Sequence, residues 1–142
     1  MFPLMKTLLV IDGQGGGFGR ALIERLRAES LPVRLHAVGT NSLATSAMLK
    51  AGADTGATGE NAILVGCRRA DLIAGPIGIV MANSMMGEFS PAMASAVAES
   101  TAARVLIPVN RCDTYVAGAT ELTFGQSLDR AVELLRRLAA EG

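Results

Sequence analysis

The residues best suited to chemistry form one glycine-rich segment, Asp12-Gly13-Gln14-Gly15-Gly16-Gly17-Phe18-Gly19, directly after a short apolar run. Five of its eight positions are glycine. Between a buried strand and a helix, such a segment lets backbone amides approach an anion, because the dipole and free N–H groups of a helix N-terminus favour phosphate. The segment therefore predicts a site for a nucleotide or another phosphorylated small molecule. A tight turn that only requires small residues is the alternative.

The spacing of these glycines bears on the type of nucleotide site. Gly13, Gly17 and Gly19 match GxxxGxG, a spacing associated with short-chain dehydrogenases, whereas GxGxxG would require glycine in place of Phe18. No GK[ST] follows the segment, which excludes a Walker A phosphate loop.

The residues that follow argue against a dehydrogenase. The acidic residue that holds the ribose of NAD about 20 residues after the glycines is missing, and Thr40 and Asn41 stand there instead. The catalytic Tyr-xxx-Lys pair of the short-chain dehydrogenases cannot be formed, because no lysine follows Lys50. The cofactor is therefore unknown, with NADP and other nucleotides both open.

Three further loops are expected to meet the glycine-rich segment at the carboxyl ends of the strands, where doubly wound sheets bind ligands. The binding residues predicted from these loops are Thr40, Asn41, Gly75, Pro76, Asn110 and Arg111. Arg111 is a cation suited to bidentate contact with phosphate or carboxylate. An ion pair with Asp113 or Glu121 is the alternative.

No residue is assigned a catalytic role. Asp12 is interpreted as the acceptor that braces the glycine-rich segment, rather than as a base or a magnesium ligand. Cys112 has no histidine nearby in the sequence and is more typical of a small buried side chain than of a nucleophile. Glu60 and Glu88 are the candidates for acid–base chemistry, although each is predicted near a helix start, where an acid is favourable anyway. His36 is interpreted as a packed histidine.

Alternating apolar segments predict the elements that position these residues. Strands are expected over 6–12, 33–38, 71–75 and 104–109, and helices over 17–30, 43–51, 60–69 and 90–100. Residues 79–86 are apolar and could form a helix or a strand, and a helix is the favoured interpretation. Residues 53–58 are ambiguous between loop and strand, and a final amphipathic helix has one apolar stripe, Leu128, Ala131, Val132, Leu135, Leu138 and Ala139. The predicted fold is a single α/β domain over 1–142, a Rossmann-like three-layer sandwich with a mostly parallel sheet of about five strands and helices on both faces.

Composition limits the partners. The 142 residues carry thirteen basic and thirteen acidic side chains, so no basic stripe for nucleic acid or basic face for a membrane surface is expected. Two cysteines in no metal-binding pattern, and no signal peptide, indicate a cytoplasmic protein with reduced thiols and no metal site. Half of the residues are hydrophobic and only 18% are charged, which predicts a homodimer or higher homo-oligomer with its contact over 79–93.

From Met5 to about Leu138 the chain resembles a family of small bacterial proteins defined as domain of unknown function 3842. The segments that carry the resemblance are VIDGQGGGFGRALIERL, GTNSLATSAMLKAGAD, GATGENAI, GPIGIVMANSMMGEFSPAMA and IPVNRC. It implies a Rossmann-like fold and a start at Met5, with residues 1–4 as an extension. It implies no reaction, cofactor or partner.

Two functions therefore stay open, and whether the protein is an enzyme is not decided by these residues. One is a protein that binds a nucleotide or phosphorylated metabolite at the glycine-rich segment. The other is a non-catalytic oligomeric regulatory or interaction module in which that segment is purely structural.

Overall fold

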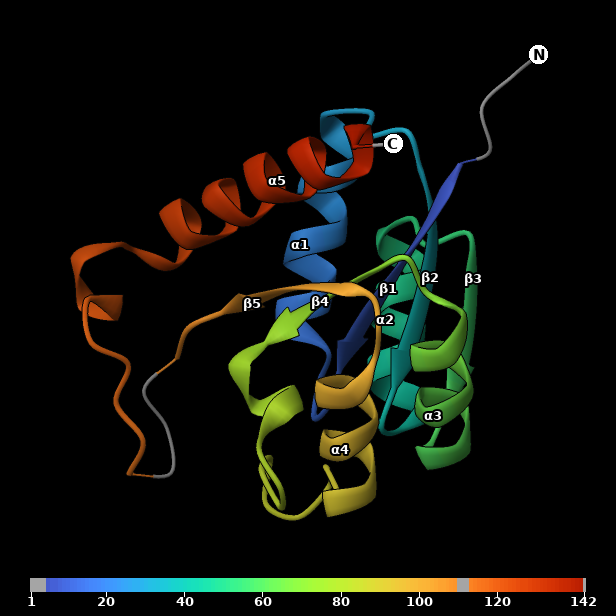
Figure 1. Ribbon diagram of the computed structural model, residues 1–142, viewed down its shortest axis with the longest axis vertical. Coiled ribbons are helices and arrows are strands. Elements are labelled where there is room, and N and C mark those ends of the chain that lie inside the picture. The colour runs from blue at the N-terminus through green and yellow to red at the C-terminus, as the bar shows by residue number, and fades with distance from the viewer. Residues whose placement is uncertain (1–4, 110–112, 142) are drawn as a thin grey trace.

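The computed structural model describes residues 5–109 and 113–141, and it places five parallel strands in one sheet with helices on both faces (Figure 1). The elements in chain order are β1 (Lys6–Asp12), α1 (Gly17–Ala28), β2 (Val33–Gly39), α2 (Ser42–Ala51), β3 (Thr55–Thr58), α3 (Glu60–Arg69), β4 (Leu72–Pro76), the 3-10 helix η1 (Ile77–Val80), α4 (Pro91–Glu99), β5 (Ala103–Ile107), the 3-10 helix η2 (Ala119–Glu121) and α5 (Phe124–Ala140). The predicted α/β sandwich is confirmed, and 53–58 contains a strand.

The strand order β3-β2-β1-β4-β5 puts β1 at the centre of the sheet. Leu8 of β1 lies opposite Leu35 of β2 on one side and Leu72 of β4 on the other. The chain first builds the sheet outward from β1 to β3 and then returns to build from β4 to β5. Loops at the carboxyl ends of β1 and β4 therefore lead away from each other, and the crevice between them is where this topology binds ligands.

Two apolar cores enclose the sheet. Leu8 and Val10 face a core shared with α1, α2 and α5, whereas Leu9 and Ile11 face a core shared with α3 and α4. All four side chains are fully buried. Burial on both faces explains why β1 is a continuous apolar run rather than an alternating one. The predicted stripe of α5 packs into the first of these cores.

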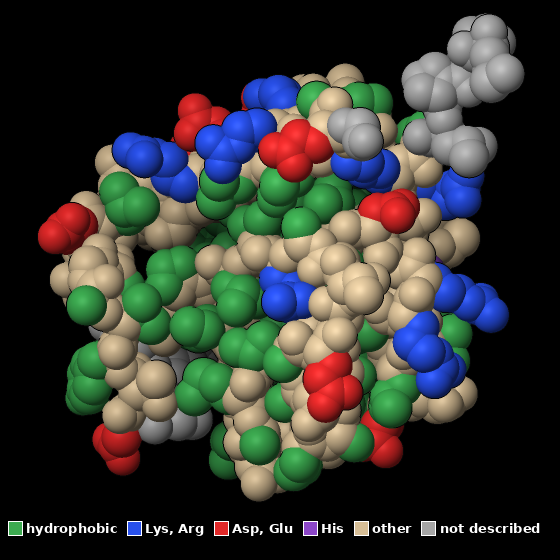
Figure 2. All heavy atoms as spheres, in the orientation of Figure 1, with side chains coloured by type: hydrophobic (Ala, Val, Ile, Leu, Met, Phe, Trp, Pro, Cys, Tyr) green, Lys and Arg blue, Asp and Glu red, His purple; other side chains and the backbone are tan. Residues whose placement is uncertain are grey.

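The surface is divided by type of side chain. Figure 2 shows Lys and Arg along α5 and at the edges of the molecule, with hydrophobic side chains gathered on the face beneath that helix. Within the described residues, no helix is long and apolar enough to cross a membrane.

The predicted helix over 79–86 is wrong. η1 ends at Val80, and the chain then folds back so that Ser84 and Phe89 form an antiparallel bridge. Ile79 and Phe89 are both fully buried in the same core. A continuous helix would separate two residues at these positions by about 15 Å. The fold-back brings both side chains to the core, and it leaves residues 81–88 at the crevice.

Candidate functional site

Asp12 organises the glycine-rich turn from its centre. Its carboxylate is 4% exposed at the end of β1, where Oδ1 accepts a hydrogen bond from the Gly13 amide and Oδ2 accepts one from the Gly19 amide, both at 2.8 Å. Burial raises the pKa of Asp12 above its ordinary value, and the amides of Gly19, Gly13 and Phe18 oppose that rise. Asp12 thus holds both ends of the turn together, in the bracing position expected from the sequence.

Three of the five glycines in this turn are required by the protein itself. A Cβ on Gly13 would lie 2.6 Å from Met85 Sδ, and a Cβ on Gly19 would lie 2.4 Å from Met48 Sδ. Gly16 has φ +77°, in the left-handed region, and a Cβ there would lie 2.9 Å from the backbone of Ala44. These glycines let the turn pack against its neighbours.

Gly15 and Gly17 differ from the other three. Both are exposed, neither has a left-handed φ, and a Cβ on either would meet no atom within 4 Å. The amides of Gly13, Gly16 and Gly19 each donate within the protein. The structure gives no such acceptor to the amides of Gly15 and Gly17 within its described residues. Two exposed glycines whose amides have no acceptor among the described residues therefore lie at the first residue of α1, Gly17, and two residues before it.

Glu88 links three loops through one oxygen. Its Oε1 accepts hydrogen bonds from the Gln14 amide at 2.8 Å, from Thr40 Oγ1 and from Asn41 Nδ2 at 3.2 Å. The Thr40 hydroxyl and the Gln14 amide hold the pKa of Glu88 below its ordinary value. Glu88 does not cap a helix, because Ser90 is the N-cap of α4. Its role as a link was missed from sequence, where the available signal is that Glu88 is the only charged residue in 72–98.

Thr40 and Asn41 close the turn on the β2 side. Asn41 Nδ2 also donates to the Gln14 carbonyl at 2.9 Å, while Asn41 Oδ1 accepts from the Ala44 amide as the N-cap of α2. The polar groups that follow β2 are thus used in internal contacts, and Thr40 and Asn41 join the glycine-rich turn as predicted.

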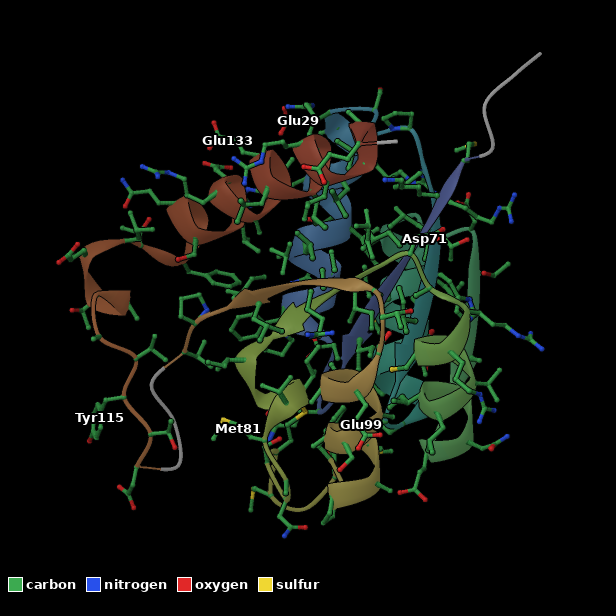
Figure 3. The ribbon with its side chains drawn as sticks, viewed as in Figure 1. Glu29, Asp71, Met81, Glu99, Tyr115 and Glu133 are labelled. Atoms are coloured by element: carbon green, nitrogen blue, oxygen red, sulfur yellow. The ribbon has the colours of Figure 1, made fainter. Side chains whose placement is uncertain are left out.

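A cavity of about 390 Å³ lies in the crevice between the ends of β1 and β4. Its volume lies in the ordinary range for small-molecule sites. Its lining residues, mostly apolar, are Asp12, Gln14, Phe18, Pro76, Ile77, Gly78, Met81, Ser84, Met85, Met86 and Val109. In Figure 3 the labelled Met81 lies on the connection between β4 and α4. Of the two residues predicted at the end of β4, Pro76 lines the cavity. Gly75 instead allows β4 to pack closely against β1, because a Cβ on Gly75 would lie 2.5 Å from the Ile11 carbonyl oxygen.

A second, more open hollow of about 550 Å³ lies on the other side of the turn. It shares Asp12, Gln14 and Phe18 with the cavity and includes the two exposed glycines. Arg20 reaches it from α1, with its side chain 58% exposed. The predicted loop residues Asn110 and Arg111, with Cys112, lie outside the described residues. The structure therefore brings together Asp12–Gly19, Thr40, Asn41 and Pro76.

The remaining candidates lie in structural contacts. Glu60 begins α3 and accepts a hydrogen bond from the Ser90 hydroxyl. His36 Nδ1 lies 2.7 Å from Thr55 Oγ1, and burial lowers the pKa of this histidine. Burial raises the pKa of Cys67 to about 11, so its thiol is not a nucleophile at neutral pH. Among the described residues of the site, Asp12 is the only buried ionisable group.

Comparison with solved structures found weak likenesses. A probable oxidoreductase from Mycobacterium abscessus is 21% identical with a TM-score of 0.49, and the match covers 99% of this chain and 45% of that one. The protein AibC is 16% identical with a TM-score of 0.49, over 96% and 40% of the two chains. A dodecameric FMN-dependent UbiX-like decarboxylase from Escherichia coli O157:H7 is 22% identical with a TM-score of 0.45, over 89% and 76%. This chain thus spans less than half the length of the first two.

The comparison with protein families gives a clearer result than the structural one. A search of curated proteins found no match. One family model, described as a domain of unknown function (DUF3842), matches residues 7–140, which is nearly the whole chain and extends from within β1 to the end of α5. The chain therefore belongs to the DUF3842 family, as the resemblance over Met5 to about Leu138 predicted.

Proposed function

We propose that this protein binds a phosphorylated small molecule across the glycine-rich turn, with the phosphate at the amides of Gly15 and Gly17 and the apolar part in the crevice cavity. The observation that carries the proposal is that neither glycine is explained by the protein itself. Each is exposed, and an added Cβ would meet nothing. A ligand that approaches the backbone closely would require glycine at both positions.

The charges around the turn support this orientation. The first turn of α1 contains no acidic residue, so its dipole and free amides favour an anion. Arg20 adds a cation on the same side. On the β2 side of the turn, the carboxylate of Glu88 lies against Gln14 and Thr40 and repels phosphate. The phosphate therefore faces outward and the rest of the ligand enters the cavity.

The contacts of Glu88 favour a mononucleotide over a dinucleotide. In dinucleotide-binding Rossmann domains, an acid at the end of β2 holds the adenosine ribose. Here Glu88 contacts Thr40 and Asn41 across that position. A ligand with one phosphate group and one ring system, extending from the turn towards β4, avoids this contact, whereas NAD and NADP would have to displace it.

Calorimetry tests the proposal with AMP, GMP, FMN, NAD and NADP as probes. At least one should bind saturably to the wild-type protein. Gly17→Val should weaken that binding by at least about tenfold, since the side chain stands where phosphate would meet the amides. Its melting temperature should stay near that of the wild type, because the position is open. Ala92→Val, at an exposed position in the first turn of α4, is the matched control and should bind normally.

Two results would contradict this assignment. If none of the five probes binds saturably, the proposal of a phosphorylated ligand is contradicted. Binding by Gly17→Val at wild-type affinity would move the phosphate away from the turn.

The homo-oligomer remains a separate prediction, with a smaller contact than the sequence suggested. Within 79–93, the side chains of Ile79, Phe89 and Met93 serve the protein's own core, while Met86 is 95% exposed. Light scattering at micromolar concentration should give at least twice 14.7 kDa. A mass of one chain at every concentration would end the prediction.

A further inference from the structure

Met85 and Met86 form the centre of an unfavourable turn at the mouth of the cavity. Their φ angles are 57° and 56°, and the Gly87 amide donates to the Ser84 carbonyl at 3.2 Å, which closes the turn. Positive φ at both central positions is the pattern of a type I′ turn, which Asn-Gly adopts readily and two side chains with long stems do not. Asn83, two residues before Met85, also has a positive φ, 63°.

Hydrogen bonds of the residues next to this turn fix its position. Ser84 Oγ donates to the Gly78 carbonyl at 2.6 Å, and the Asn83 amide donates to the Phe89 carbonyl at 2.8 Å. Phe89 itself is fully buried. The left-handed backbone is therefore imposed by a fixed frame, and strained residues held in this way are typical of ligand sites.

The turn brings thioethers to the cavity wall, and Met85 packs against the adjoining core as well. Met81, Met85 and Met86 all line it, together with Phe18. Met86 is 95% exposed, so its side chain contributes almost nothing to the protein's own packing. Thioethers make favourable contacts with aromatic rings and adapt to their outline. The polar groups at this wall are few, and the buried carboxylate of Asp12 is one of them.

We infer that the Met85–Met86 turn binds the aromatic ring of the ligand, and that the ligand is a phosphorylated heteroaromatic compound whose ring presents an N–H donor to Asp12. This inference rests on the proposed function and specifies the part of the ligand that enters the cavity. The methionines contact the face of the ring, and the Asp12 carboxylate accepts a hydrogen bond from an N–H group at the edge of the ring. The phosphate stays at the amides of Gly15 and Gly17. The Asp12 carboxylate would repel an anionic group in the cavity, and a purely aliphatic group would offer it no further donor beside the amides of Gly13 and Gly19.

Methyl NMR with methionine labelled at its methyl carbon tests the ring contact directly. AMP, GMP and FMN are compared with ribose 5-phosphate, which has the phosphate but no ring. The best-binding mononucleotide should shift the Met85 and Met86 methyl signals upfield, because an aromatic ring shields a methyl group on its face. Met93, buried in the core formed with α4 and absent from both hollows, is the internal control and should not move. Ribose 5-phosphate should bind more weakly and leave all three signals in place.

A variant separates the strain from the binding. Met86→Gly should raise the melting temperature by roughly 2–5 °C, because glycine adopts positive φ without strain. The same variant should lower the affinity for the best-binding mononucleotide by about two- to tenfold and should leave the affinity for ribose 5-phosphate unchanged. Met5→Gly is the control, since Met5 is also exposed but has no positive φ. It should change neither quantity.

The outcomes distinguish the two proposals. If ribose 5-phosphate binds as tightly as every mononucleotide, or if mononucleotides bind without moving the Met85 and Met86 signals, the ring assignment is overturned and the phosphate site stands. A lower melting temperature in Met86→Gly would also overturn it. If neither ribose 5-phosphate nor any mononucleotide binds, the proposed function itself fails.

Discussion

Replacing Asp12 with alanine should lower the free energy of unfolding by about 2–4 kcal/mol, because two buried amides lose their acceptor at once. The carboxylate accepts from Gly13 and Gly19 at 2.8 Å each. Both glycines are buried, so water does not readily replace the lost acceptor. Chemical denaturation measures the change, and the glycine-rich turn should open in the variant.

Asp71 provides the matched control for this prediction. Its carboxylate also accepts a backbone hydrogen bond at 2.8 Å, from Thr7, but it is exposed, as Figure 3 shows at the upper right. Water can replace the side chain there, so Asp71→Ala should cost no more than about 1 kcal/mol. Equal losses in the two variants would mean that Asp12 does not brace the turn.

The pH dependence of the Asp12 variant has a defined sign. The pKa of Asp12 is raised in the folded protein, chiefly by burial, so the folded state binds the proton more tightly than the unfolded state does. The favourable contribution of this group is therefore fully present below pH 3.8 and declines as the pH rises through the folded pKa. Relative to wild type, Asp12→Ala should lose most stability at acidic pH and less at neutral pH.

The fold was predictable because its signals are local. β1 is a continuous apolar run, Ser90-Pro91 is a helix start and α5 has one apolar stripe, and each of these patterns specifies its element without help from the rest of the chain. The segment after η1 lacks such a signal. Its apolar residues predict a helix, but Ile79 and Phe89 must both reach one core, and that requirement is visible only in three dimensions.

The site was predictable in its position but not in its assignments. The glycine-rich turn lies at the switch point as expected, yet the roles of its glycines depend on contacts with Met48, Ala44 and Met85, which are far away in the sequence. Glu88 lies 74 residues from Gln14 in the sequence, and its carboxylate accepts a hydrogen bond from the Gln14 amide. No spacing rule relates them, so sequence reasoning considered only a cap or an acid–base role for Glu88.

Phe89 should be the most sensitive position outside the turn, because it joins the core to the cavity wall. Its side chain is fully buried, and its backbone makes hydrogen bonds in both directions with the fold-back, from the Asn83 amide and to the Ser84 carbonyl. Phe89→Ala should cost about 3–5 kcal/mol, through lost burial and the cavity left behind. Denaturation of the variant measures this loss.

A matched comparison with Phe124 separates the effect of full burial at Phe89 from that of an aromatic contact at a half-exposed position. Phe124 is 47% exposed and packs edge-on against Phe18, with ring centroids 4.9 Å apart. Phe124→Ala should therefore cost no more than about 1.5 kcal/mol. Phe89→Leu retains most of the apolar volume and should fall between the two alanine variants in stability. Because Phe89 holds the frame under Met85 and Met86, Phe89→Leu should also weaken mononucleotide binding while the protein is still folded. Equal costs for the two alanine variants, or undiminished binding by Phe89→Leu, would show that the fold-back keeps its geometry without this anchor.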